Sequence, residues 1–242
     1  MSKKRFLTFL MVLMVWEAAA CLFKRPVIIP YPGDVLKIMV HDLTDGSFYL
    51  AAVHTLLRML KGLALALILA LLLGMLSGLY PSFEESFSAL NDIIKAVPNI
   101  SYIIIILIWL GGERSVTLIT FFILFPILYA DILLGMHSVP DSILKISQLE
   151  RIPLLKKIKT VYWPYVLPQL TGSLKVAFGM GFKVSVMAEI LGAVRIGVGR
   201  EMSVARAYVE TDRIVAWTIW IILLSLLVNA VFDRIMKYRK KD

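Results

Sequence analysis

Long apolar stretches separated by short polar segments run through the whole chain of 242 residues. A bilayer core of about 30 Å is crossed by roughly 20 mostly apolar residues in an α-helix. Six stretches approach this length, namely residues 6–23, 62–83, 90–109, 115–136, 165–194 and 214–232. The pattern therefore predicts an all-α fold, a polytopic transmembrane helical bundle of about six spans.

Charged residues within these stretches are few, and the fifth stretch holds more of them than any other, namely Lys175, Lys183 and Glu189. A charge at the centre of a bilayer costs about 2.5 to 3.5 kcal/mol on insertion scales. Lys183 and Glu189 are therefore candidates for a translocation path, with an internal structural pair or snorkelling to an interface as the alternative. The two lie about 120° apart around a helix and are not expected to pair with each other. Lys175 lies near the end of its stretch and is expected to snorkel.

Two further residues are candidates for the path, Asp131 in the fourth stretch and Gly179 in the fifth, where a glycine permits a kink. Ordinary helix pairing or packing is the alternative for both. Gly74 and Gly78 form a small-x-x-x-small pattern, which lets two helices approach closely. That approach takes place either within the chain or between two copies of it.

The N-terminal segment, residues 1–25, begins with the basic run Lys3-Lys4-Arg5 and continues into the first apolar stretch. A cleaved signal peptide has this layout, but Glu17 lies where signals prefer neutral residues. A retained N-terminal transmembrane helix is therefore expected, with the cleaved signal as the alternative.

The next segment, residues 26–61, is expected to be an outer loop with an interfacial helix. Pro30-Tyr31-Pro32-Gly33 breaks the chain there, and downstream apolar residues share one helical face, namely Val53, Leu56, Leu57 and Leu60. The alternative is that these residues are the polar start of the second span. Residues 62–235 then form the membrane core, and residues 236–242 form a basic tail.

Composition and charge agree with a membrane protein, since 59% of residues are hydrophobic and 18% are charged, against about 25% charged in a soluble domain. The net charge of +9 comes from Lys and Arg between apolar runs and at the chain ends. This distribution fits lipid headgroups rather than nucleic acid. With the N-terminus inside, the inner segments carry the larger share of Lys and Arg, so both termini are expected in the cytoplasm. One Cys and three scattered His indicate no disulfide, metal site or catalytic set.

A long cytoplasmic loop, residues 138–164, is the most informative segment. Pro140-Asp141-Ser142 is a helix-start signal. Apolar residues then follow on one predicted helical side, namely Ile143, Leu144, Ile146, Leu149 and Ile152. The loop ends in residues 161–168, which contain Pro164 and Pro168. A short amphipathic helix at a membrane surface suits docking into a partner's groove.

The same loop resembles the cytoplasmic loop of binding-protein-dependent ABC importer permeases. Their pattern is Glu-Ala-Ala, a Gly, nine residues, then Ile-x-Leu-Pro. With Pro164 on the motif's proline, Val161 takes the Ile position, Glu150 the acidic position and Arg151 the Gly position. Lys145-Ile146-Ser147 stands where Glu-Ala-Ala is usual.

Other landmarks resemble the nitrate, sulfonate and taurine subgroup of these permeases, over roughly residues 26 to 235. The subgroup's fifth-span signature, Gly-x-x-Trp-Lys-x-x-Val-x-Ala-Glu, matches residues 179–189, with Phe182 in place of the Trp. The remaining landmarks, in chain order, are Ile29-Pro30-Tyr31-Pro32, His54-Thr55-Leu56-Leu57-Arg58, Lys95-Ala96-Val97-Pro98, Ile108-Trp109-Leu110-Gly111, Gly197-Val198-Gly199 and residues 211–217.

The resemblance implies a type I ABC importer permease fold, in a multi-pass protein of the cell (inner or plasma) membrane. It implies a second permease copy, two cytoplasmic ATP-binding subunits and an extracytoplasmic solute-binding protein as partners. The ATPase-coupling residues it implies are Ile146, Leu149, Glu150, Arg151, Ile152, Pro153, Leu154, Leu155 and Pro164. The chain has no G-x-x-x-x-G-K-[ST] motif, so ATP is expected to be used by partner subunits, and no cofactor is expected on this chain.

Two other classes compete with this interpretation. One is a secondary transporter driven by an ion gradient, with Lys183, Glu189 and Asp131 as coupling groups, although no inverted repeat of broken helices is present. The other is a membrane-embedded enzyme or assembly factor, for which the sequence offers no catalytic set. The resemblance suggests nitrate, sulfonates, taurine or a thiamine-precursor-like pyrimidine as solute, and does not choose among them.

Overall fold

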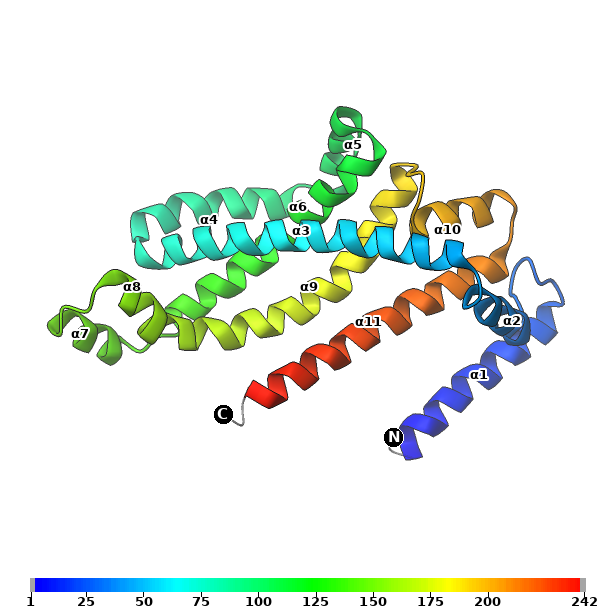
Figure 1. Cartoon of the computed structure of the whole chain (residues 1–242), viewed down its shortest axis with the longest axis horizontal. Helices are drawn as coiled ribbons and strands as arrows, with labels where there is room; N and C mark the ends of the chain where they lie inside the picture. Colours follow the sequence, from blue (N-terminus) through cyan, green and yellow to red (C-terminus); the bar gives the residue numbers. More distant parts are fainter. Residues whose placement is uncertain (1–2, 240–242) are drawn as a thin grey trace.

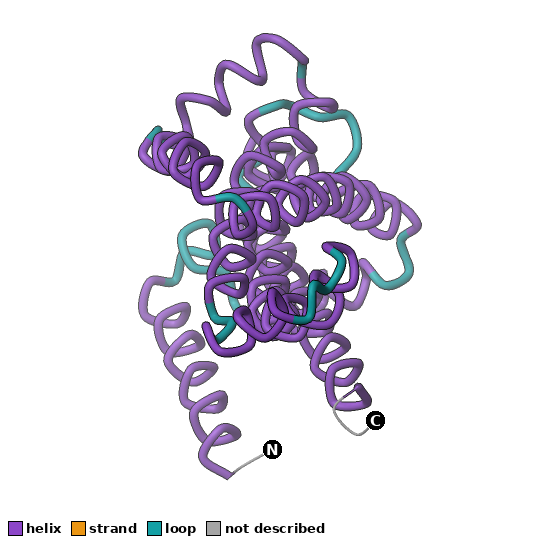
Figure 2. Tube along the Cα trace, turned by 90° about the vertical axis from the view of Figure 1, so that its left-hand side faces the viewer, coloured by secondary structure: helices purple, strands orange, loops and turns teal. Residues whose placement is uncertain are grey.

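The structure, a computed structural model, describes residues 3–239. It contains α1 (Lys3–Phe23), α2 (Pro32–Asp42), α3 (Gly46–Leu79), α4 (Pro81–Ala96), α5 (Asn99–Leu110), α6 (Gly112–His137), α7 (Asp141–Leu149), α8 (Leu154–Lys157), a π-helical turn η1 (Ile158–Tyr162), α9 (Trp163–Leu191), α10 (Val198–Ala207) and α11 (Thr211–Arg239). Figure 2 shows helices and loops and no strand in this part of the chain. The all-α prediction is confirmed.

The centre of the molecule is a stack of α3, α6 and α9, which bury one another's apolar faces. In Figure 1 the short helices α7 and α8 lie at one end of this stack, while α2 and α10 lie at the other. α11 packs on α9, α10 and α2. α1 lies apart from the stack in Figures 1 and 2, and is tied down where Trp16 Nε1 donates to the Pro30 carbonyl at 3.0 Å.

The separate interfacial helix predicted before residue 62 is wrong, because residues 53–60 belong to the first half of α3. This agrees with the alternative, that they begin the second span. α3 starts after Asp45, whose carboxylate accepts from the Ser47 N–H at 2.9 Å, and hydrogen bonds from Ser47 hold the pKa of Asp45 below its usual range. The helix then meets no Pro until Pro81, so it runs for 34 residues.

The third predicted span, residues 90–109, is also corrected, because the chain bends by 90° between α4 and α5. The bend lies at Val97 and Pro98. A residue before proline is pushed out of the helical region, and Val97 adopts φ −67° and ψ 127°. One apolar stretch in the sequence therefore becomes two helices that point in different directions.

Three helical segments in residues 3–239 are long and apolar enough to cross a membrane, namely α3, α6 and Thr211–Val231 of α11. The bent pair α4 and α5 makes a fourth. The six predicted spans also include α1, in which Leu10–Phe23 forms a shorter apolar helix, and α9. α9 is 29 residues long but carries three charges, and two of them form ion pairs, Lys175 with Asp233 and Glu189 with Arg58.

Glycines on α3 bring its backbone against α6. A Cβ built on Gly78 would lie 2.5 Å from Met136 Cβ, and one on Gly74 would lie 2.8 Å from Ile132 Cγ2. The small-x-x-x-small pattern therefore serves packing within the chain, which was one of the two alternatives. The contact between the two helices extends from Gly62, where an added Cβ would lie 2.7 Å from Thr120 Cβ, to Gly78.

We expect Gly78→Val to lower the free energy of unfolding by about 1–3 kcal/mol, because extra atoms in a packed interface force neighbouring side chains and backbone to move. Thermal or denaturant unfolding of the purified chain in a neutral detergent measures the change. Gly172→Ala is the matched control, since a Cβ there meets nothing within 4 Å. Equal stability of Gly78→Val and the wild type would contradict this account of the α3–α6 contact.

Candidate functional site

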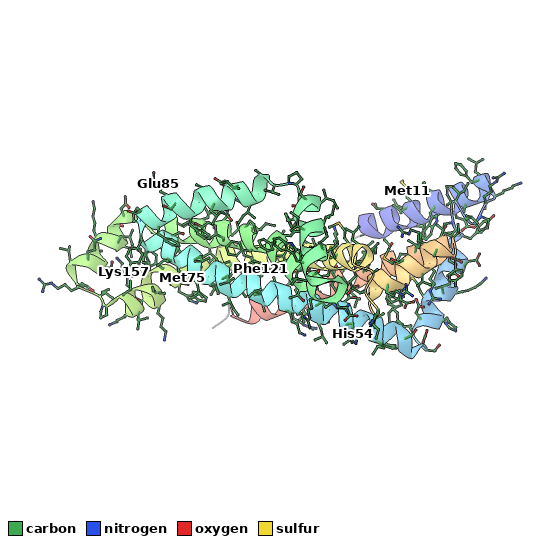
Figure 3. The ribbon with its side chains drawn as sticks, turned by 90° about the horizontal axis from the view of Figure 1, so that it is seen from above. Met11, His54, Met75, Glu85, Phe121 and Lys157 are labelled. Atoms are coloured by element: carbon green, nitrogen blue, oxygen red, sulfur yellow. The ribbon has the colours of Figure 1, made fainter. Side chains whose placement is uncertain are left out.

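The predicted coupling loop forms a compact protrusion at one end of the molecule, where Lys157 is labelled in Figure 3. Its apolar residues divide between two faces rather than sharing one. Ile143 and Leu144 pack against the core, whereas Leu149 and Leu155 are each 83% exposed. Ile146 and Leu154 are also exposed. The outward face is therefore apolar and uncovered.

A tight turn joins α7 to α8, and Arg151 occupies its left-handed position with φ +48°. The Ile152 N–H donates to the Ser147 carbonyl at 3.2 Å, and the Arg151 N–H donates to the Gln148 carbonyl at 3.0 Å. This is the Schellman arrangement, which usually places glycine at the left-handed position. Arg151, which stands at the Gly position of the permease motif, therefore adopts the left-handed conformation that usually requires glycine. This conformation costs a residue with a side chain about 1–2 kcal/mol.

The loop does not end at Pro164 as predicted, because the helix continues through it. α8, η1 and α9 form one helical run from residue 154 to 191. Pro164 lacks an N–H, and the wider π turn before it lets the Trp163 N–H donate to the Ile158 carbonyl instead. Tyr162 in this turn is buried, which raises its pKa above the usual value, and Lys157 Nζ lies 5.7 Å from the centre of its ring.

At the opposite end of α9, Glu189 is completely buried and forms an ion pair with Arg58 of α3. Arg58 Nη1 donates to Glu189 Oε1 at 2.7 Å and to the Ile196 carbonyl at 2.7 Å. The Thr55 hydroxyl donates to Glu189 Oε2 at 2.9 Å. Arg58 Nη2 also lies 3.4 Å from Glu113 Oε2 at the start of α6. One guanidinium therefore connects α3, α6, α9 and the segment that follows α9.

The chain after α9 folds back over the Glu189 carboxylate and adds the Gly199 N–H as a donor to Oε2 at 2.9 Å. Two glycines make this approach possible. A Cβ on Gly197, whose φ is +152°, would lie 2.6 Å from Glu189 Oε2, and one on Gly199 would lie 2.5 Å from Glu189 Cβ. The landmark Gly197-Val198-Gly199 is thus the segment of backbone that covers the buried ion pair.

Glu189 was predicted to line a translocation path or, as the alternative, to form an internal structural pair. The structure shows the internal pair. Sequence reasoning missed its partner, because Arg58 lies 131 residues away and its helix appeared to be an outer segment. A signal was present: Arg58 is a charge within a long apolar helix, in the landmark that begins at His54. His54 lines a polar cavity of about 510 Å³ beside this pair, together with Glu113 and Arg195.

The other three path candidates do not converge with Glu189. Lys183 is exposed on a different face of α9, as the 120° separation predicts, and forms no ion pair within residues 3–239. Asp131 is half-buried on α6 and likewise has no ion-pair partner in that range. A Cβ built on Gly179 meets nothing within 4 Å. The four candidates are spread over two helices and several faces.

These features define a multi-pass helical membrane protein with an exposed apolar loop at one end. The chain belongs to the family of binding-protein-dependent transport system inner membrane components, whose sequence pattern matches residues 55–241. It is the translocation subunit of an ATP-driven importer, and the predicted family and function are confirmed.

Two relatives and one solved structure agree with this family assignment. The chain is 28% identical over 238 residues to a putative ABC transporter permease protein of Methanocaldococcus jannaschii, covering 94% of this chain and 86% of that one. It is 25% identical over 229 residues to the taurine transport system permease protein of Escherichia coli K12, covering 92% and 83%. The structure of the MetNI methionine ABC transporter in inward-facing conformations matches with a TM-score of 0.63, at 16% identity, over 76% of this chain and 92% of that chain. This last likeness shows the shared fold.

We expect Arg58→Met to lower the free energy of unfolding by about 3–5 kcal/mol, because it leaves the buried Glu189 carboxylate without its cation. Glu189→Gln should cost less than this, since Arg58 keeps Glu113 and the Ile196 carbonyl. The double variant should lose less than the sum of the two single losses, which denaturant unfolding in detergent measures. Lys175→Met, which breaks a more exposed ion pair, is the control and should cost under about 1 kcal/mol. Strictly additive losses would show that Arg58 and Glu189 are not coupled.

Proposed function

We propose that the chain forms the solute path of the importer together with a second copy of itself, and that two cytoplasmic ATP-binding subunits dock on residues 138–164. The observation that carries this proposal is the uncovered apolar face of the loop, on which Leu149 and Leu155 are the most exposed residues. Exposed leucines on two short helices that are joined by a tight turn, as here on α7 and α8, are typical of a docking surface. Partner subunits bind and hydrolyse the ATP, since this chain lacks the phosphate-binding motif.

The coupling is mechanical. A partner that pushes on Leu154 and Leu155 acts on the first turn of a helical run that continues to Leu191, a length of about 57 Å at 1.5 Å per residue. The far end of this run holds Glu189, and through Arg58 it is tied to α3. Movement at the loop is thereby passed to the opposite end, so the assembly alternates between two global states, inward-open and outward-open, with ATP and solute favouring different ones.

The solute is a small organic or inorganic anion such as nitrate, a sulfonate or taurine, or a thiamine-precursor-like molecule, delivered by an extracytoplasmic binding protein. The relative named as a taurine transport permease supports this group. The structure disfavours the rival, an ion-gradient transporter. Its three coupling groups would have to meet, whereas Glu189 is enclosed with Arg58 while Lys183 and Asp131 lie elsewhere.

The loop and both termini lie on the cytoplasmic side of the cell membrane. Figure 1 supports this topology, since α1 begins and α11 ends pointing away from the end where α2 and α10 lie. The segments so placed in the cytoplasm carry more Lys and Arg than the outer segments, which is the direction of the positive-inside rule. Cys21, the one cysteine of the chain, is exposed near the opposite end of α1 and falls on the outer side.

The docking surface is tested with Leu149→Asp combined with Leu155→Asp. We expect at least a tenfold loss of ATP-binding subunit copurified with the tagged chain from its native host, and a matching loss of solute uptake. A desolvated charge at an apolar contact costs more than the 1.4 kcal/mol that a tenfold change represents.

Two controls accompany this test. Arg151→Gly should keep the subunit, because glycine adopts the left-handed conformation of that turn readily. Tyr208→Asp, an exposed residue at the opposite end of the molecule, should also keep it. Undiminished copurification by the double Leu variant would refute the assignment of the loop.

The topology is tested with thiol labelling, using the single native cysteine. A membrane-impermeant maleimide should label Cys21 in intact cells. In a Cys21→Ser background, Ser142→Cys on α7 should be labelled only after the cells are permeabilised. The reverse pattern would place the loop outside the cell and overturn the proposal.

A further inference from the structure

A cavity of about 500 Å³ lies between α9, α10 and α11, apart from both the coupling loop and the Arg58–Glu189 pair. Its walls are aliphatic side chains and methionines, among them Met187, Ile190, Met202 and Ile221. Two polar residues reach it, Lys183 and Thr218, and no acidic residue lines it. Volume and lining match those of a small-molecule site, which is mostly apolar with a few polar groups that fix orientation.

Lys183 is the distinctive group of this cavity, because it is a cation without a counter-charge. The other two charges of α9 are satisfied, Lys175 by Asp233 and Glu189 by Arg58. Thr218 donates its hydroxyl proton to the Ile214 carbonyl at 2.8 Å, so it offers a ligand only acceptor capacity. Lys183 is exposed, so its ammonium group is accessible to an anion that comes from outside the chain. No acidic residue among those that line the cavity competes for it.

We infer that this cavity receives the transported solute as an aliphatic monoanion, with its charged head on Lys183 and its apolar body against Met187, Ile190 and Ile221. The inference rests on the proposed function. The lining of the cavity distinguishes the candidate solutes. A zwitterion such as taurine would bring an ammonium group into a cavity that has no acidic residue to receive it. A fully inorganic anion would leave the apolar walls without a partner. The site therefore favours a short alkyl chain with one negative head over taurine and over nitrate.

The depth of Lys183 favours a solute over a phospholipid. Lys183 lies six residues before Glu189 along α9, about 9 Å at 1.5 Å per residue. The Arg58–Glu189 pair lies near the outer end of that helix, so Lys183 sits inward of it. Phospholipid head groups lie at the membrane surface.

The test uses the purified full-length chain in nanodiscs of phosphatidylcholine, with 1-pentanesulfonate, taurine and sodium nitrate as probes. Calorimetric titration gives each affinity, and the thermal unfolding midpoint gives an independent readout, since a ligand that binds only the folded chain raises it. We expect 1-pentanesulfonate to bind at least tenfold more tightly than taurine or nitrate. Lys183→Gln should weaken pentanesulfonate at least tenfold, and Lys183→Arg should retain it. Lys175→Gln, on the same helix but outside the cavity, should bind as the wild type does.

Several results would overturn the inference. Equal affinities for pentanesulfonate and taurine would refute the preference for a monoanion, and wild-type affinity in Lys183→Gln would refute the site. A second series in nanodiscs containing phosphatidylglycerol separates solute from lipid. If phosphatidylglycerol alone gave the Lys183-dependent rise in midpoint and blocked pentanesulfonate, the cavity would be a lipid site. Copurification of the ATP-binding subunit with Lys183→Gln reports separately on the proposed function, because the docking loop lies at the other end of α9.

Discussion

The arrangement of this permease at the end opposite residues 138–164 depends on one buried carboxylate, Glu189. An ionised group that is removed from water is stable only with an opposite charge and hydrogen-bond donors around it. Arg58, Thr55 and the backbone N–H of Gly199 meet that requirement together. Because these groups come from α3 and from the segment after α9, satisfying one charge fixes the relative positions of several elements.

The helical run that carries this pair at one end begins in the proposed docking loop. Between the two ends, glycines hold α3 against α6, and both of these helices pack on α9. Such close packing resists gradual deformation and favours movement of whole helices. Under the proposed coupling, this property lets a push delivered at residues 154–157 reach the opposite end of the helical run.

The two faces of α9 carry different chemistry. The inner face buries Glu189 against α3, and its charge is fully satisfied within the chain. Lys183, on another face, opens into an apolar cavity and has no counter-charge. α9 is therefore less apolar than a typical membrane span, because charges that serve structure and charges that serve a ligand both lower its hydropathy.

Sequence alone was enough to predict the helical class, the family and the special status of Lys183 and Glu189, and to propose residues 138–164 as a docking loop. These follow from local properties, namely apolar length, turn residues and motif order. It could not determine that Glu189 pairs with Arg58 or that Gly78 packs on Met136, because such contacts join residues far apart in the chain. It also placed a span where Pro98 bends the chain, and read Arg151 as a departure from a motif although the backbone there adopts the conformation that the motif's glycine would adopt. Tertiary structure decided these points, since pairing and backbone conformation are set by what surrounds each residue in space.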